Sequence, residues 1–159
     1  MEYMDKRFQR KGGKSNTQIG KEFEEKTLKY FLENGIELEK QYTIEIGLNY
    51  KKKHKFDLGN NNLIIECKAM RWTETEKVPS AKLRSWNEAM YYFHLAPKEY
   101  KKIFFVEMNY NQKYTQTLLE YYIDKYYNMI PEDVLLYDYY VDNNWCKIYT
   151  YEDIKKRIL

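Results

Sequence analysis

The chain has 159 residues, of which 43% are hydrophobic and 32% charged, and its formal net charge is +3. This length and composition exclude an intrinsically disordered chain and predict one globular domain, over residues 16–159, after a flexible basic arm over residues 1–15. Two cysteines are too few for a disulfide framework, and the two histidines lack the paired spacing of a zinc site. No apolar run is long enough for a signal peptide or a membrane span, so we expect a cytoplasmic protein with no membrane partner.

The first element expected is a helix from residue 16 to a stop at residues 34–35. Its apolar positions between Ile19 and Leu32 recur at helical spacing and predict a broad buried stripe. On a helical wheel Glu24 falls inside that stripe, whereas Glu22 and Glu25 fall outside it. Gly20 lies on the same side and would allow the helix backbone to approach a sheet closely.

Two strand patterns follow. Residues 41–48 alternate apolar and polar side chains, with Leu48 as the last apolar position, and this predicts a strand with one buried face. Residues 63–69 form a short β-branched run after a Gly-Asn turn, which predicts a second strand of a hairpin. Because alternate side chains share a face, Glu66 and Lys68 point the same way along that strand.

The remainder of the chain alternates helical and strand patterns. A polar loop over residues 71–79 precedes a helix capped by Ser80, in which Trp86 lies mid-stripe and is expected in the core. Residues 102–108 are almost continuously apolar, which predicts a central strand with parallel neighbours. The last patterns predict a helix over residues 115–129, strands over 133–141 and 145–149, and a short helix over 152–158.

The hairpin places charges where a core is expected. Asp57 lies upstream of the turn, and Glu66 and Lys68 share one face of an otherwise apolar strand. Such charges destabilise the fold unless they are compensated, and a divalent cation held between Asp57 and Glu66 is one compensation. A plain ion pair is the alternative. The Cys67 thiol should point to the opposite face and pack in the core.

Asp57, eight further residues and then Glu66-x-Lys68 resemble the core motif of the PD-(D/E)xK nuclease superfamily, although Phe56 replaces the proline. Other acid-x-Lys copies lie in helical or polar segments, so only this one has the strand context. The resemblance covers residues 16–108 and implies an α/β fold: a three-layer, restriction-endonuclease-like αβββαβ core with a mixed central sheet. Residues 109–159 would then be C-terminal α/β additions.

The resemblance also implies a set of catalytic roles. Asp57, Glu66 and the backbone carbonyl of Cys67 would bind Mg²⁺, with Mn²⁺ as a substitute, and Lys68 would orient the attacking water and stabilise the pentacovalent phosphate. Gly20-x-x-Phe23-Glu24 is similar to the first-helix signature of related families, where the glutamate holds a second ion or the metal's water shell. A one-metal site without Glu24 stays open.

Basic and polar residues near the motif are candidates for nucleic-acid contacts, since clustered cations can hold a phosphate backbone. Trp72, in the same loop as Arg71, either stacks on nucleic acid or folds back onto the domain. The candidate contact residues are Lys51, Lys52, Lys53, Lys55, Arg71, Lys82, Arg84, Asn87 and Tyr91.

The function expected from this set is a magnesium-dependent DNA endonuclease of restriction, repair or junction-resolving type. Cutting both strands usually needs two sites, which a homodimer would provide. Two alternatives stay open: a nucleic-acid-binding or assembly subunit that keeps the fold without the chemistry, and an α/β domain that uses its tyrosine-rich surface for protein contacts.

Overall fold

The structure, a computed structural model, describes residues 14–159, so most of the arm expected over residues 1–15 lies outside the described residues. The helices and strands follow one another as α2 (Asn16–Glu33), β1 (Glu39–Ile46), β2 (Lys52–Gly59), β3 (Leu63–Lys68), α3 (Ser80–Leu95), β4 (Lys101–Glu107), β5 (Tyr110–Asn111), β6 (Gln116–Thr117), α4 (Leu118–Tyr126), a 3₁₀ turn (Tyr127–Met129), β7 (Val134–Tyr140), β8 (Trp145–Tyr149) and α5 (Tyr151–Ile158). The order of elements through β4 is the one expected from the sequence.

Six strands form one mixed sheet in the order β1-β2-β3-β4-β7-β8. The first three are an antiparallel meander, β4 is parallel to both β3 and β7, and β8 is antiparallel to β7. The apolar run of residues 102–108 therefore lies at the centre of the sheet between two parallel neighbours, as predicted.

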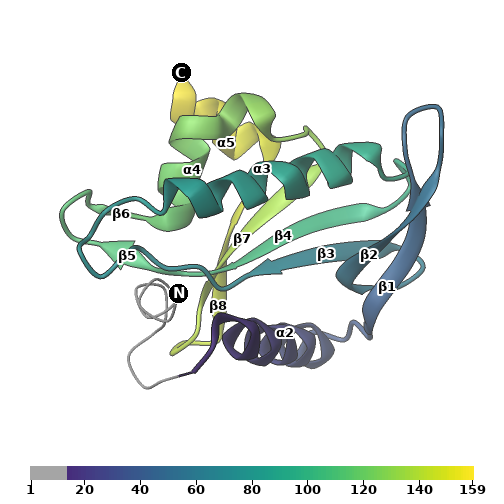
Figure 1. The fold of residues 1–159 in the computed structure, drawn as a ribbon, viewed down its shortest axis with the longest axis horizontal. Coiled ribbons are helices and arrows are strands. Elements are labelled where there is room, and N and C mark those ends of the chain that lie inside the picture. Colours follow the sequence, from purple (N-terminus) through teal and green to yellow (C-terminus); the bar gives the residue numbers. More distant parts are fainter. Residues whose placement is uncertain (1–13) are drawn as a thin grey trace, which may run out of the picture.

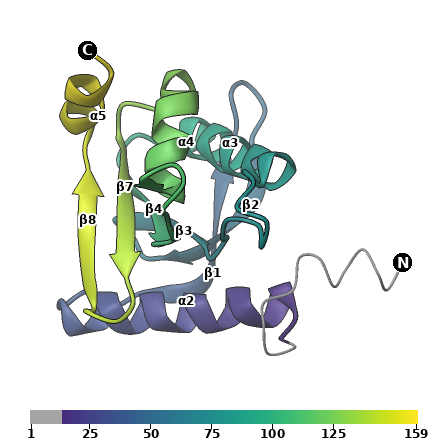
Figure 2. The ribbon, with the colours of Figure 1, turned by 90° about the vertical axis from the view of Figure 1, so that its left-hand side faces the viewer.

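Helices cover both faces of this sheet, which gives three layers (Figures 1 and 2). Helix α2 lies along one face, and α3 and α4 lie on the other, with α5 beside α4. The C-terminal strands β7 and β8 lengthen the sheet beyond β4. The protein is thus an α/β protein with four helices and a mixed six-stranded sheet within residues 14–159.

Each face of the sheet has its own hydrophobic core. Phe23 and Phe31 of α2 pack with strand residues such as Ile65 and Phe105 on one face. Trp86, which is fully buried as expected, packs on the other face with residues of α3 and α4, including Tyr122. Residues that alternate along β3 and β4 serve the two cores in turn, which explains why these strands read as continuous apolar runs.

Helix α2 has well-formed ends. The Ser15 side chain accepts a hydrogen bond from the backbone N–H of Gln18 at 3.1 Å, and the helix ends before Asn34 and Gly35, whose φ of 79° is easily adopted by glycine. The predicted closeness at Gly20 is wrong, because a Cβ built there meets no atom within 4 Å. Leu32 is also outside the buried stripe and is 56% exposed, although its neighbour Phe31 is buried.

Three boundaries differ from the prediction because local chemistry intervenes. Strand β1 ends at Ile46, where Gly47 turns the chain at a φ of 153°, and leaves Leu48 63% exposed. Helix α3 begins at Ser80, but its N-cap is Pro79 and no side chain caps it. Helix α4 begins at Leu118 rather than near residue 115, because β5 and β6 form a short hairpin and Thr117 then provides a capping box.

Among residues 14–159, no helix combines the length and the apolar character needed to span a bilayer.

Candidate active site

The candidate site begins where β2 and β3 separate. The two strands pair only at Leu58 with Ile65 and at Gly59 with Ile64. Further along β3, the backbone N–H of Cys67 donates a hydrogen bond at 2.8 Å to Oδ2 of Asp57 instead of to a β2 carbonyl. The Asp57 carboxylate therefore satisfies a strand donor that the ladder has left free, and it lies in the seam between the two strands.

The backbone of β2 is irregular at this point. Phe56 and Leu58 are both fully buried but belong to the cores on opposite faces of the sheet, although residues two apart normally share a face. The chain must therefore rotate at Asp57, and the facing residue on β1, Gln41, has a positive φ of 51°. This distortion leaves the Asp57 side chain between the faces, where groups from both can reach it.

Glu24 reaches Asp57 from the α2 side. Burial, followed by the charge of Asp57 and a hydrogen bond with its side chain, raises the pKa of Glu24 to about 7, and Lys40 and Lys21 oppose the rise. The two neighbouring glutamates of the helix are engaged elsewhere, in ion pairs between Glu22 and Lys14 and between Glu25 and Lys40. Of these three acids, Glu24 is the one beside Asp57.

Glu66 of β3 lies beside Asp57, on the side away from Glu24. The residue is half-buried. Burial, followed by the charge of Asp57, raises the pKa of Glu66 well above its ordinary value, and the charge of Lys68 opposes the rise. None of the ion pairs among residues 14–159 involves Glu66, Asp57 or Lys68. The closed Glu66–Lys68 pair considered as an alternative is thus not formed.

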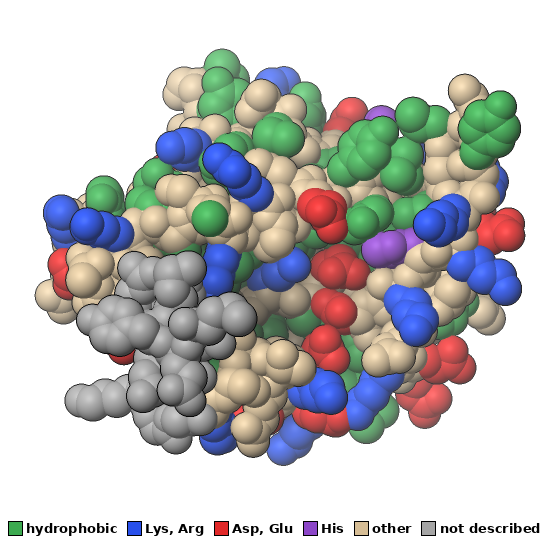
Figure 3. All heavy atoms as spheres, viewed as in Figure 1, with side chains coloured by type: hydrophobic (Ala, Val, Ile, Leu, Met, Phe, Trp, Pro, Cys, Tyr) green, Lys and Arg blue, Asp and Glu red, His purple; other side chains and the backbone are tan. Residues whose placement is uncertain are grey.

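A fourth carboxylate, Glu88 of α3, extends this cluster. Burial lowers the pKa of His54, and the charges of Asp57 and Glu88 oppose this change. Burial raises the pKa of Tyr92, and the charges of Glu88 and Glu66 add to the rise. Figure 3 shows acidic side chains in a row across the middle of one face, with Lys and Arg side chains on both sides. We call Glu24, Asp57, Glu66 and Glu88 the acidic row; it runs from α2 through the β2–β3 seam to α3.

The donors in the row suit a hard divalent cation. Burial, followed by the charge of Asp57, raises the pKa of Glu24 and of Glu66, and a cation in the seam would offset both effects. In an extended strand the N–H and C=O of one residue face the same neighbour, so the carbonyl of Cys67 faces the seam with its N–H. Within the described residues, no three His, Cys, Asp or Glu side chains are close enough to enclose an ion. A Mg²⁺ held by Asp57 and Glu66 would therefore complete its shell with backbone and water oxygens.

The Cys67 thiol points away from the seam, as expected. It packs against the core on the α2 side and interacts with Thr27. Burial, followed by the charge of Asp57, raises the pKa of the Cys67 thiol well above its ordinary value. The side chain is therefore a neutral packing group and not a thiolate ligand.

The expected nucleic-acid contacts separate into two groups. Lys52, Lys53 and Lys55 are exposed on β2, and the Lys51 ammonium donates a hydrogen bond at 2.8 Å to the carbonyl of Gly47. Lys52, Lys53 and Lys55 lie on the strand that carries Asp57, and Lys51 directly precedes it.

The second group lies on α3 and in the loop before it. Arg71 forms an ion pair at 2.9 Å with Glu107, and the Asn87 side-chain oxygen accepts a hydrogen bond at 2.7 Å from Tyr122. The side chains of Arg71 and Asn87 therefore also connect elements of the fold. Lys82 is half-buried on α3, whereas Arg84 and Tyr91 are exposed there.

The Trp72 side chain folds back onto the domain, which decides between the two alternatives considered for it. Its indole stacks on Tyr114 with ring centroids 5.2 Å apart and donates to the carbonyl of Asn109.

Sequence reasoning missed Glu88, and it treated His54 only as part of a charge run. A pattern was available for the first: Arg84, Glu88 and Tyr92 are spaced four apart and so share one side of α3. The signal for His54 was its place three residues before Asp57 on an exposed strand. Without the tertiary structure neither pattern distinguishes these residues from an ordinary solvated helix side or strand edge.

Comparison of the chain with protein-family models, curated proteins and solved structures gives no significant match. The interpretation of the site therefore depends on its own residues and geometry.

Proposed function

We propose that the protein is a metal-dependent endonuclease that hydrolyses phosphodiester bonds in DNA, and that its core is of the restriction-endonuclease-like type. The observation that carries the proposal is the meeting of Glu24, Asp57 and Glu66 at the β2–β3 seam, with Lys68 beside Glu66. Glu24 of α2 and Glu66 of β3 each lie beside Asp57 of β2. A fold that needed only stability would gain nothing from crowding these carboxylates, because each raises the cost of ionising the next.

In this proposal each residue has a separate task. Asp57 and Glu66 hold the cation, and the N–H of Cys67 fixes the orientation of the Asp57 carboxylate. Glu24 holds the ion's water shell from the α2 side. When bound, the cation makes its water more acidic and neutralises charge on the phosphate. The Lys68 ammonium carries a positive charge beside Glu66 and would stabilise the negative charge that grows on the attacked phosphate.

The flanking cations fit the same proposal. Lys52, Lys53 and Lys55 project from the strand that carries Asp57 and can bind the phosphates of a backbone that crosses the acidic row. This attraction is needed because a row of carboxylates would otherwise repel a polyanion. Binding should therefore weaken steeply with salt.

The test uses supercoiled, linear, single-stranded and branched DNA incubated with the full chain in Mg²⁺, Mn²⁺ or EDTA. We expect metal-dependent cutting that falls by about 100-fold or more in Asp57→Asn and Glu66→Gln. Glu25→Gln is the matched control, because it makes the same change on α2 in a glutamate that faces Lys40 rather than Asp57.

Two results would overturn the proposal. One is the absence of cutting together with no uptake of Mg²⁺ or Mn²⁺ in calorimetry. The other is metal-dependent cutting that Asp57→Asn leaves unchanged. DNA binding without cutting in any of these conditions would instead support a nucleic-acid-binding subunit with this fold.

A further inference from the structure

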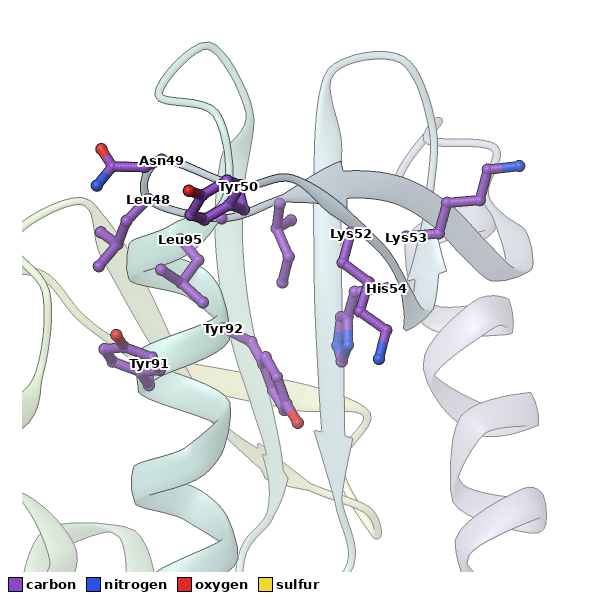
Figure 4. A pocket seen from close by; sticks show the side chains of 11 residues that line it. Leu48, Asn49, Tyr50, Lys52, Lys53, His54, Tyr91, Tyr92 and Leu95 are labelled. Atoms are coloured by element: carbon purple, nitrogen blue, oxygen red, sulfur yellow. The ribbon is translucent and has the colours of Figure 1, made fainter.

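A pocket of about 620 Å³ adjoins the acidic row. It is lined by residues 46–50 at the end of β1 and in the following loop, by 52–54 of β2, and by Tyr91, Tyr92 and Leu95 of α3. Figure 4 shows the loop above the pocket, with Tyr92 of α3 facing His54 across it and Tyr91 on the other side of the helix. The volume lies within the range of sites for small organic groups, about 300 to 1,000 Å³.

The loop that roofs the pocket is held in place by its backbone. The N–H of Gly47 donates a hydrogen bond at 3.2 Å to the carbonyl of Leu95, and the Lys51 ammonium binds the Gly47 carbonyl. Gly47 itself has a φ of 153°, and a Cβ there would lie 1.9 Å from the carbonyl oxygen of Tyr50. The pocket is therefore shaped by the fold before any ligand arrives.

The lining is aromatic and basic. Tyr50 is 92% exposed and Tyr91 53% exposed, so both rings present faces to solvent. The loop residue Leu48 is likewise 63% exposed. Lys52 supplies a positive charge at the pocket, and Figure 4 shows Lys53 pointing away from it. Exposed aromatic rings beside cations are typical of surfaces that bind unstacked nucleobases and their phosphates.

His54 and Tyr92 connect the pocket to the acidic row. Their rings are stacked with centroids 4.0 Å apart and an interplanar angle of 26°. Both residues line the pocket. The charge of Glu88 affects both of them, the charge of Asp57 also affects His54, and the charge of Glu66 also affects Tyr92. A group in the pocket would thus contact residues that lie within the electrostatic reach of the acidic row.

His54 also carries a polar atom that needs a partner. Its Nε2 is buried and has no hydrogen-bond partner among residues 14–159. Buried nitrogens of this kind almost always have one. Burial lowers the pKa of His54, which favours the neutral ring.

We propose that this pocket binds an unpaired nucleobase adjacent to the phosphodiester at the acidic row. The inference rests on the proposed function and narrows its substrate to nucleic acid with an unpaired nucleotide, such as a single strand, a bulge or a branch. A paired base hides its faces in the helical stack, so Tyr50 and Tyr91 could stack only on a base that has left it.

The test measures binding of the full chain in EDTA at fixed salt, so that no cutting intervenes. The probes are a fluorescent strand of about 15 nucleotides, its perfect duplex, the duplex with one bulged nucleotide, and the same bulge without its base. We expect the strand and the bulge to bind about fivefold or more tightly than the duplex, and the abasic bulge to lose that preference. Tyr50→Ala and Tyr91→Ala should also lose it, whereas Tyr151→Ala, which changes a 44% exposed tyrosine of α5, should keep it.

Equal affinity for duplex, bulge and abasic bulge would overturn the inference, as would an unchanged preference in both pocket variants. These results are separate from the cutting assay. Metal-dependent cutting of the perfect duplex, with no preference for an unpaired base in the binding assay, would support the proposed function and contradict the inference. Preferential binding of unpaired bases without any cutting would contradict the endonuclease proposal and support the pocket as a binding site.

Discussion

The acidic row should make the metal-free protein less stable as the pH rises, and Glu24→Gln should remove part of that effect. The pKa of Glu24 rises from 4.5 to about 7 on folding. As the pH rises, Glu24 loses its proton at a lower pH in the unfolded chain than in the folded protein. Between the two pKa values the folded state therefore binds more protons, and the free energy of unfolding falls with increasing pH. Below about pH 4.5 the contribution is fully present, and above about pH 7 it is lost.

The magnitude follows from the shift. A change from 4.5 to about 7 corresponds to about 3 kcal/mol at roughly 1.4 kcal/mol per unit. Because Glu24 is only half-buried, solvent screening reduces this to roughly 1 to 2 kcal/mol. Glutamine keeps a donor for Asp57 without the charge, so Glu24→Gln should gain about this amount near pH 8 and little near pH 5.

Urea unfolding in EDTA at about pH 5 and about pH 8 measures this difference. Glu25→Gln serves as the control, since Glu25 pairs with Lys40 on the surface of the same helix. Saturating Mg²⁺ near pH 8 should stabilise the wild type more than Glu24→Gln. If Glu24→Gln and Glu25→Gln change stability equally at both pH values, the crowding of carboxylates at the seam is not as described.

Three further results are expected. Lys68→Met should reduce cutting by about 100-fold while calorimetry still detects Mg²⁺ uptake, because the ammonium acts on the phosphate and not on the ion; loss of both would indicate that Lys68 supports the site itself. Gly47→Ala should lower the free energy of unfolding by about 2 kcal/mol or more in urea titration, whereas Gly20→Ala, where a Cβ meets nothing within 4 Å, should raise it by about 0.5 to 1 kcal/mol. Thr117→Ala should cost about 1 to 3 kcal/mol in thermal or urea unfolding, because it removes the α4 cap and the 2.7 Å hydrogen bond to buried Asp138; a change below about 0.5 kcal/mol would contradict this assignment.

The element order could be predicted because it follows from local periodicity. The alternation in residues 41–48 and the apolar run in 102–108 were each sufficient to predict a strand, and the strands observed there are Glu39–Ile46 and Lys101–Glu107. Predictions failed where a single backbone feature decides: the positive φ at Gly47 ends β1 early, and the cap at Thr117 shortens α4.

The site was predicted only in part for the same reason. Strand alternation was sufficient to place Glu66 and Lys68 on one face, and the helical wheel was sufficient to select Glu24 among three glutamates. The sequence by itself thus determined which residues carry charge into the protein and on which side of each element they lie. Only the tertiary structure decided that β2 rotates at Asp57, that the seam opens there and that Glu88 and His54 lie beside it. These three features depend on contacts between segments far apart in the chain, and a local sequence pattern carries no information about the free energy of such contacts.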